Sequence, residues 1–209
     1  MNFVQSFYGW QGRGWAALVA VAVTLVFMFV LFPWASAKTG SRQNRVVDLQ
    51  KAYTVEMFTG VLRGWSTPKT KEEDTQENRE TLRNAVGIMK RKNIRNFDLA
   101  FPVVYALALA LSYASLSGRR EPTALDFVLF LTPFVAGLFD LVENGIHLYL
   151  LSGVNTADDV EAAVKAGKFS PSLVFAASAF AHAKYLLLAV SLVSVVIGFA
   201  SCLLRRARP

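Results

Sequence analysis

Four long apolar segments alternate with polar segments along this chain of 209 residues. The apolar segments cover residues 15–34, 97–116, 124–151 and 173–204, numbered here as spans one to four. At about 1.5 Å per residue, each can cross a hydrocarbon core of about 30 Å. Backbone groups in lipid must pair within their own segment, so each span is predicted to be a helix. We therefore predict an all-α polytopic membrane protein, a bundle of four transmembrane helices in a single membrane domain covering residues 1–209.

Span one also has features of a signal sequence. Ala35-Ser36-Ala37 resembles a signal-peptidase site at the end of an apolar stretch. The stretch is long for a signal peptide, and Trp15 and Trp34 bracket it in the manner of interface anchors. We expect an uncleaved helix, while cleavage before Lys38 stays open as the alternative.

Residues 37–96, between spans one and two, are predicted to form a helical extramembrane loop. An amphipathic helix is expected over residues 45–65, ended by Ser66-Thr67-Pro68. Its apolar face is predicted to contain Tyr53, Met57, Phe58, Val61 and Trp65.

The second half of this loop changes from polar to apolar. Residues 69–80 are polar and are expected to be a surface loop. A second helix is predicted to start near Thr81, to pack through Leu82, Val86 and Met89, and to continue into span two. The pair of loop helices either lies on the membrane or forms a lid.

Composition supports the membrane assignment and argues against nucleic acid as a partner. Hydrophobic residues make up 54% of the chain and charged residues 18%, whereas soluble domains carry about 25% charge. The net charge of +7 is typical of basic loops beside anionic head groups, and no nucleic-acid motif accompanies it. The distribution of arginines favours cytoplasmic termini, but the basic residues at 90–95 oppose this orientation.

Span three carries polar residues where lipid disfavours them. Asp140, Glu143, Asn144 and His147 are offset by 3, 4 and 7 positions, which places all four on one helix face. Carboxylates that face lipid cost several kcal/mol, about 3 at a helix centre, so this face must contact protein or water. The face is a candidate functional site, and a polar network that only joins helices is the structural alternative.

Span four supplies candidate partners for these carboxylates. His182 and Lys184 are about 160° apart around a helix, because each residue advances by about 100°. Lys184 shares its face with small residues and is predicted to be the counter-charge of Asp140 or Glu143. His182 is expected to form a second polar face with Ser178 and Tyr185, directed toward span one or two.

Span two adds Asp98 and Tyr105 on one seam. The charged residues of the spans then gather in the half of the bundle that the long loop caps. This asymmetry predicts a polar cavity open to one side. The candidate catalytic residues are Asp140, Glu143 and Lys184, and the candidate ligand-binding residues are Asp98, Tyr105, Asn144, His147, His182 and Tyr185.

Several chemistries remain open for such a cavity. We predict that the cavity binds or processes a small amphipathic or lipid-like molecule. Acid–base work is a reasonable chemistry for it, because low dielectric and a nearby lysine tune carboxylic acids. A divalent metal could use Asp140, Glu143 and His147, with His182 or Asp98 added, but a lysine nearby opposes cation binding. No cofactor is therefore predicted, and a divalent metal stays open as the alternative. The lone Cys202 excludes an internal disulfide. A membrane scaffold or assembly subunit is the alternative function, and proton or ion translocation is the third.

The span motifs resemble those of a group of small four-helix membrane proteins, mostly bacterial. The segments that carry the resemblance begin at Asn96-Phe97-Asp98, Phe139-Asp140 and Lys184-Tyr185, with "D-x-x-F-P-x-x-Y" and "D-L-x-E-N" as their patterns. The resemblance implies a multi-pass protein of the bacterial inner or plasma membrane, but no activity. A looser similarity of fold links the chain to the sterol isomerase and sigma-2 receptor superfamily, from which no residue role is carried over. The expected partners are membrane lipids and an amphipathic ligand, and the sequence leaves enzymatic activity and oligomerisation open.

Overall fold

A computed structural model describes residues 13–36, 46–67, 76–117 and 122–206 of the chain. In these four stretches every regular element is a helix and no strand occurs. Four helical segments are long and apolar enough to cross a membrane: Gly14–Trp34, Ala85–Leu116, Ala124–Leu150 and Pro171–Leu204. The predicted all-α class, a bundle with four candidate spans, is confirmed.

The first and last of these segments expose most of their apolar surface. Only 6% of the most apolar window of the first segment is buried, and 11% of that of the last. Large side chains such as Leu18, Phe29, Leu192 and Ile197 are exposed on them. Apolar patches of this extent are rare on soluble monomers but suit contact with lipid tails. The second and third segments are more buried, at 44% and 39% of the same kind of window.

The chain divides into two compact units, where the sequence predicted a single domain. Unit one contains residues 1–26, 101–139 and 183–209, and unit two contains residues 27–100 and 140–182. The helices α9 (Ala124–Leu150) and α11 (Pro171–Arg206) each contribute residues to both units.

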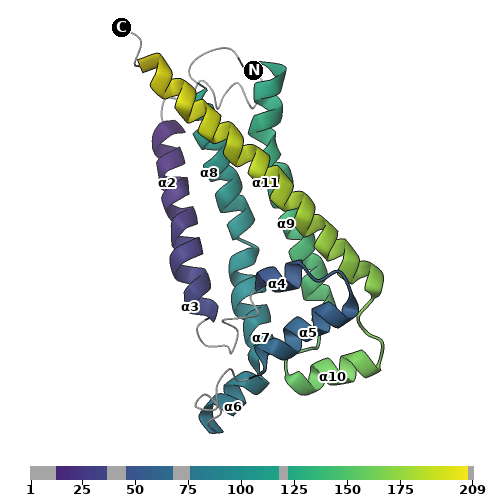
Figure 1. Cartoon of the computed structure of the whole chain (residues 1–209). Helices are drawn as coiled ribbons and strands as arrows, with labels where there is room; N and C mark the ends of the chain where they lie inside the picture. Colours follow the sequence, from purple (N-terminus) through teal and green to yellow (C-terminus); the bar gives the residue numbers. More distant parts are fainter. Residues whose placement is uncertain (1–12, 37–45, 68–75, 118–121, 207–209) are drawn as a thin grey trace. The chain divides into compact units, whose positions relative to one another are not determined.

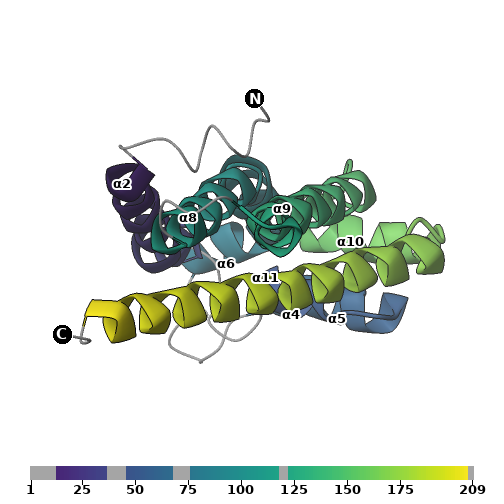
Figure 2. The same cartoon turned by 90° about the horizontal axis from the view of Figure 1, so that it is seen from above.

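Unit one is built from α2 (Arg13–Val26), α8 (Phe101–Leu116) and parts of α9 and α11. The helices α2 and α8 lie side by side in both views (Figures 1 and 2). Close approach between α8 and α9 depends on Gly137, since a Cβ atom there would lie 3.2 Å from the carbonyl oxygen of Pro102. At the start of α9, buried Asp126 accepts a hydrogen bond of 2.7 Å from the Tyr113 hydroxyl.

Unit two contains the short helices of the chain and a core of its own. Its elements are η1 (Phe27–Leu31), α3 (Phe32–Ser36), α4 (Val46–Gln50), α5 (Val55–Trp65), α6 (Gln76–Arg83), α7 (Ala85–Met89), the π-helix η2 (Lys90–Asp98) and α10 (Ala157–Lys165). Its core joins α4, α5, α7, η2 and α10 to the end of α9 and the start of α11, and contains Phe58, Trp65, Met89, Leu150 and Phe169. Figure 1 shows α4, α5 and α10 as neighbouring short helices.

The prediction of one continuous helix over residues 45–65 is wrong. Two helices, α4 and α5, replace it, because Thr54 caps the second: its hydroxyl accepts a hydrogen bond of 3.2 Å from the backbone N–H of Met57. The buried face also differs from the prediction, since Thr59 and Leu62 are buried while Tyr53 and Met57 are exposed. The predicted end of the helix at Trp65 is confirmed.

The polar tract over residues 69–80 is only partly described. Residues 68–75 lie outside the described residues, as do Ala37 and Lys38 of the predicted cleavage site. The tract is already helical at Gln76, where α6 begins, so the expected start near Thr81 is wrong by five residues. The expected packing of Leu82, Val86 and Met89 is confirmed, since all three are buried.

Candidate functional site

The polar residues of α9 lie on its buried side. Relative exposure is 6% for Asp140, 0% for Glu143, 0% for Asn144 and 1% for His147. The intervening Val142 and Gly145 are exposed, as the helical period requires. We call these four residues the α9 polar row.

Asn144 links the row to span two. Its Nδ2 donates one hydrogen bond of 3.1 Å to the backbone oxygen of Asp98 and another of 3.2 Å to Oδ1 of Asp140. Both partners are acceptors, so the amide orientation is set: nitrogen toward them and oxygen away. The buried Oδ1 of Asn144 finds no hydrogen-bond partner among the described residues.

The bond from Asn144 to Asp98 has a local cause in span two. Pro102 lies four residues after Asp98 and has no N–H with which to close a helical bond to that carbonyl. Membrane helices tolerate proline where a neighbouring side chain satisfies the carbonyl that it leaves open. Asn144 does so here. The "D-x-x-F-P" pattern and the "D-L-x-E-N" pattern are thus linked through a hydrogen bond.

His147 and Glu143 form the second half of the row. The His147 Nδ1 lies 3.7 Å from Oε1 of Glu143, one helical turn earlier. On its other side, the imidazole stacks on Phe58 of α5, with ring centroids 6.1 Å apart. Phe58 in turn contacts Phe169, which precedes α11. The helix α5 therefore covers the C-terminal end of the row with an aromatic side chain.

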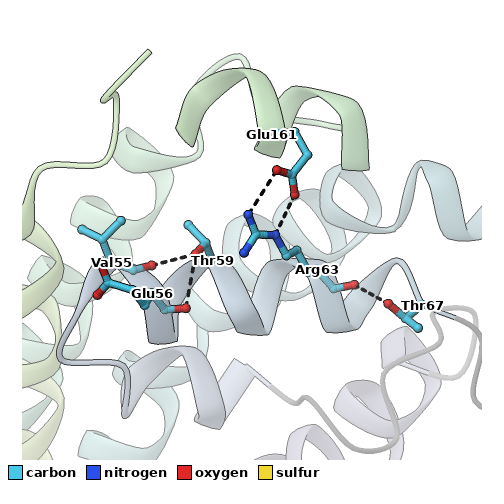
Figure 3. Close-up of polar contacts among 6 residues, drawn as sticks. All are labelled: Val55, Glu56, Thr59, Arg63, Thr67 and Glu161. Carbon is cyan, nitrogen blue, oxygen red and sulfur yellow. Dashed lines mark hydrogen bonds and ion pairs between the residues drawn. The ribbon is translucent and has the colours of Figure 1, made fainter. Parts of the chain in front are cut away.

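An ion pair outside the spans holds α5 against α10. Arg63 donates from Nε to Glu161 at 2.6 Å and from Nη2 at 3.1 Å, a two-point contact (Figure 3). This hydrogen bonding lowers the pKa of the Glu161 carboxyl below its ordinary value. On the same helix, the Thr59 hydroxyl donates to the backbone oxygens of Val55 and Glu56 (Figure 3).

His182 has a different partner from the one expected. The prediction that it faces span one or two is wrong: its Nε2 lies 2.7 Å from the hydroxyl of Tyr53, in the turn before α5. Its Nδ1 lies 2.7 Å from the backbone oxygen of Ser178. Sequence reasoning missed Tyr53 because it assigned this residue to an apolar helix face. Thr54 was the available signal, since a threonine before a helical segment marks an N-cap and places Tyr53 outside the helix.

The remaining candidates lie in unit one. Lys184 is 2% exposed, and its ammonium lies 5.0 Å from the ring centroid of Tyr185, which is partly exposed. Tyr105 is buried and packs edge-on against Phe101. Lys184 and buried Ser191 share one side of α11 while His182 is exposed, in accord with the angle between Lys184 and His182. The predicted pairing of Lys184 with Asp140 or Glu143 stays a prediction.

Lys90 is a structural residue that sequence reasoning treated only as a topology signal. Its ammonium donates to the backbone oxygens of Leu151 and Val154, at 3.1 and 2.9 Å, and to Oδ1 of Asn155 at 2.7 Å. These carbonyls follow the C-terminus of α9, where a cation is favourable. Lys90 thereby anchors η2 to the end of the helix that carries the polar row.

Two further comparisons, with metal-site geometry and with known proteins, give no role for the α9 polar row. Among the described residues, no group of three or more His, Cys, Asp or Glu side chains is arranged to hold a metal ion. No protein-family model, curated protein or solved structure matches the chain. The resemblance of the span motifs to small bacterial four-helix proteins therefore stays a prediction.

Proposed function

We propose that this chain is a multi-pass protein of a bacterial inner or plasma membrane that binds or processes a small amphipathic, lipid-like molecule. The α9 polar row would hold the head group, and the apolar helix surfaces would accommodate the tail. The proposal requires that the residues of the α9 polar row together bind the polar head group of one ligand molecule.

The observation that carries the proposal is the buried Oδ1 of Asn144. A polar network that only joins helices is stable when each of its members is satisfied, because a buried polar atom without a partner costs about 1–3 kcal/mol. The amide oxygen of Asn144 finds no partner among the described residues. A hydroxyl, amide or amine of a bound head group would supply the missing donor. The carboxyl groups of Asp140 and Glu143 lie within one turn of Asn144 on the same helix face and would contribute to the polar character of the site.

The cover over the row supports a ligand that enters by displacement of α5. Phe58 stacks on His147 from this helix. The ion pair between Arg63 and Glu161 and the hydrogen bond between Tyr53 and His182 lie at its two ends. Both are exposed contacts that cost little to break. Ligand entry would need α5 to move, which would also withdraw its buried Phe58 and Trp65 from the core of unit two.

The test is the set of amphipathic molecules that co-purify with the protein. Wild-type protein, Asn144→Leu and a matched control, Asn84→Leu at an exposed asparagine, are purified in a nonionic detergent, and their bound lipids are quantified by mass spectrometry. The wild type and the control should retain one species enriched over the bulk membrane, and Asn144→Leu should lose it. Equal lipid profiles in all three would overturn the proposal.

A scaffold or assembly subunit is the second candidate function. The hydrogen bonds from Asn144 to Asp98 and Asp140 favour it, because they join the start of span two to span three as a purely structural residue would. Asp140→Asn separates the two functions. It keeps an oxygen that accepts from Asn144 but removes the charge. Loss of the ligand with thermal stability kept would support the binding site, whereas loss of thermal stability would support the scaffold.

A further inference from the structure

The contact between Tyr53 and His182 has a defined direction of proton donation. The backbone oxygen of Ser178 only accepts hydrogen bonds, so the His182 Nδ1, at 2.7 Å from it, carries a hydrogen. In the neutral imidazole the other nitrogen, Nε2, is then an acceptor. The Tyr53 hydroxyl, 2.7 Å from Nε2, is therefore the donor of that hydrogen bond.

This arrangement contains the parts of an activated nucleophile. A hydroxyl lies within hydrogen-bond reach of a base, and a third group orients the base. Here Tyr53 is the hydroxyl, His182 the base and the Ser178 carbonyl the orienting group.

The surroundings of the pair are accessible and apolar. Tyr53 is 45% exposed, and Met57, one turn further along, is exposed as well. On α11, Phe175 lies seven residues before His182, hence on the same face, and is 59% exposed. A molecule that binds at this pair would also contact the exposed apolar side chains of Met57 and Phe175. This favours an amphipathic molecule.

We propose that Tyr53 and His182 form a nucleophilic pair that accepts an acyl group from an amphipathic acyl donor. The Tyr53 oxygen attacks the acyl carbon while Nε2 of His182 takes the phenolic proton. The bond between the acyl carbon and the leaving group then breaks, and the leaving group takes that proton. An acyl-tyrosine is itself an activated ester, so the donor needs a comparably good leaving group, such as the thiol of a thioester. The pair shares no residue with the α9 polar row.

The first experiment compares tyrosines within one protein. An arylsulfonyl fluoride reacts with a phenol by forming an O–S bond and releasing fluoride, while the base takes the proton. Initial labelling rates are measured by peptide mass spectrometry at Tyr53 and at Tyr149, which is 70% exposed and serves as the internal control. Accessibility alone predicts faster labelling of Tyr149. The proposal predicts faster labelling of Tyr53, by at least about tenfold, below the about 10²–10⁴-fold that a positioned base contributes in enzymes.

The variant His182→Gln separates activation from tethering. Glutamine can still accept a hydrogen bond from Tyr53 but cannot take its proton. Tyr53 labelling should fall to the rate of Tyr149 or below, with helicity and detergent stability kept. Equal rates of Tyr53 and Tyr149 in the wild type, or an unchanged Tyr53 rate in His182→Gln, would overturn the proposal.

A second measurement tests the acyl donor. Wild-type protein in detergent is incubated with a long-chain acyl thioester of N-acetylcysteamine, and acylated peptides are mapped. An acyl group on Tyr53 that is absent from His182→Gln is the expected result. Acylation confined to lysines would exclude acyl transfer by this pair. Neither measurement involves Asn144, so failure here would leave the proposed ligand site at the α9 polar row untouched.

Discussion

Asn144 donates a hydrogen bond of 3.1 Å to the backbone oxygen of Asp98, 46 residues earlier in the chain. Pro102 is the reason that this oxygen is available, because it lacks the N–H that would otherwise bond four residues back. The amide thus satisfies a carbonyl in span two while it also bonds Asp140 in span three. This relationship yields a direct test of the row.

Asn144→Leu should lower stability, because it removes two hydrogen bonds at a buried position. The expected loss of stability is about 1–3 kcal/mol, the cost of leaving a buried acceptor without a hydrogen-bond donor. The shift of the unfolding midpoint in detergent measures this loss. Asn84→Leu, at an exposed site, should have little effect. The loss should shrink in a Pro102→Ala background, since alanine restores an N–H for the Asp98 carbonyl. An equal loss in both backgrounds would show that the proline is not the cause.

The ion pair between Arg63 and Glu161 should make the contact of α5 with α10 sensitive to salt. Both side chains are about half exposed, so screening weakens their attraction. Arg63→Ala should raise hydrogen exchange in α5 and α10 at low salt, with little change in the global unfolding midpoint. High salt should bring the wild type toward the variant. Thr67→Ala, two residues after the end of α5 and outside this ion pair, is the control. Identical exchange in Arg63→Ala and wild type would contradict the expectation.

Acid should loosen the start of α10. Hydrogen bonds from the backbone N–H groups of Asn155 and Thr156, and from the Thr156 hydroxyl, lower the pKa of Asp159 below its ordinary 3.8. Because the folded-state pKa is depressed, the stabilisation is fully present above the unfolded value and is lost as pH falls through the folded one. Hydrogen exchange of α10 should rise in this acidic range in the wild type. In Asp159→Asn it should already be raised at neutral pH and change less on acidification; the same pH response in both would contradict this account.

Gly137 and Gly145 should respond in opposite directions to the same substitution. Alanine at Gly137 places a methyl group 3.2 Å from the backbone oxygen of Pro102, and backbone cannot move as a flexible side chain can. Gly137→Ala should therefore cost about 1–3 kcal/mol, as overpacking does. A Cβ at Gly145 meets nothing within 4 Å, so Gly145→Ala should stabilise α9 by about 0.5–1 kcal/mol. Thermal unfolding in detergent measures both, and destabilisation by Gly145→Ala would refute the comparison.

The predicted pairing of Lys184 with Asp140 is testable by a double-mutant cycle. Removing one partner of a buried pair typically costs about 3–5 kcal/mol, because it leaves a charge without compensation. Lys184→Met and Asp140→Asn should each destabilise the protein, and the double variant should lose less than the sum. Additive losses would show that the two residues do not interact.

Some of the site was visible in the spacing of residues along one helix. The α9 polar row follows from offsets of three and four residues, since these set a common face without reference to any other part of the chain. The same argument separates Lys184 from His182 on α11. The break between α4 and α5 was predictable from Thr54 but was missed, because the apolar period of the segment continues through it.

Other parts of the site depend on contacts between distant residues. Tyr53 and His182 are 129 positions apart, and Lys90 lies 61 positions from the Leu151 carbonyl that it caps. Nothing local to Tyr53 indicates a histidine partner. Such contacts are set when the core of Phe58, Trp65, Leu150 and Phe169 brings α5, η2, α9 and α11 together.

The sequence by itself determined the four apolar helices and the polar face of the third, because hydrocarbon thickness and the helical period act on neighbouring residues. Tertiary structure alone decided that Asn144 donates a hydrogen bond to the Asp98 carbonyl, which Pro102 cannot bond. It also decided that Tyr53 contacts His182 and that Phe58 covers His147. The physical reason is that packing of apolar side chains brings segments together without direction. Hydrogen bonds then select among the polar groups that this packing happens to bring within reach.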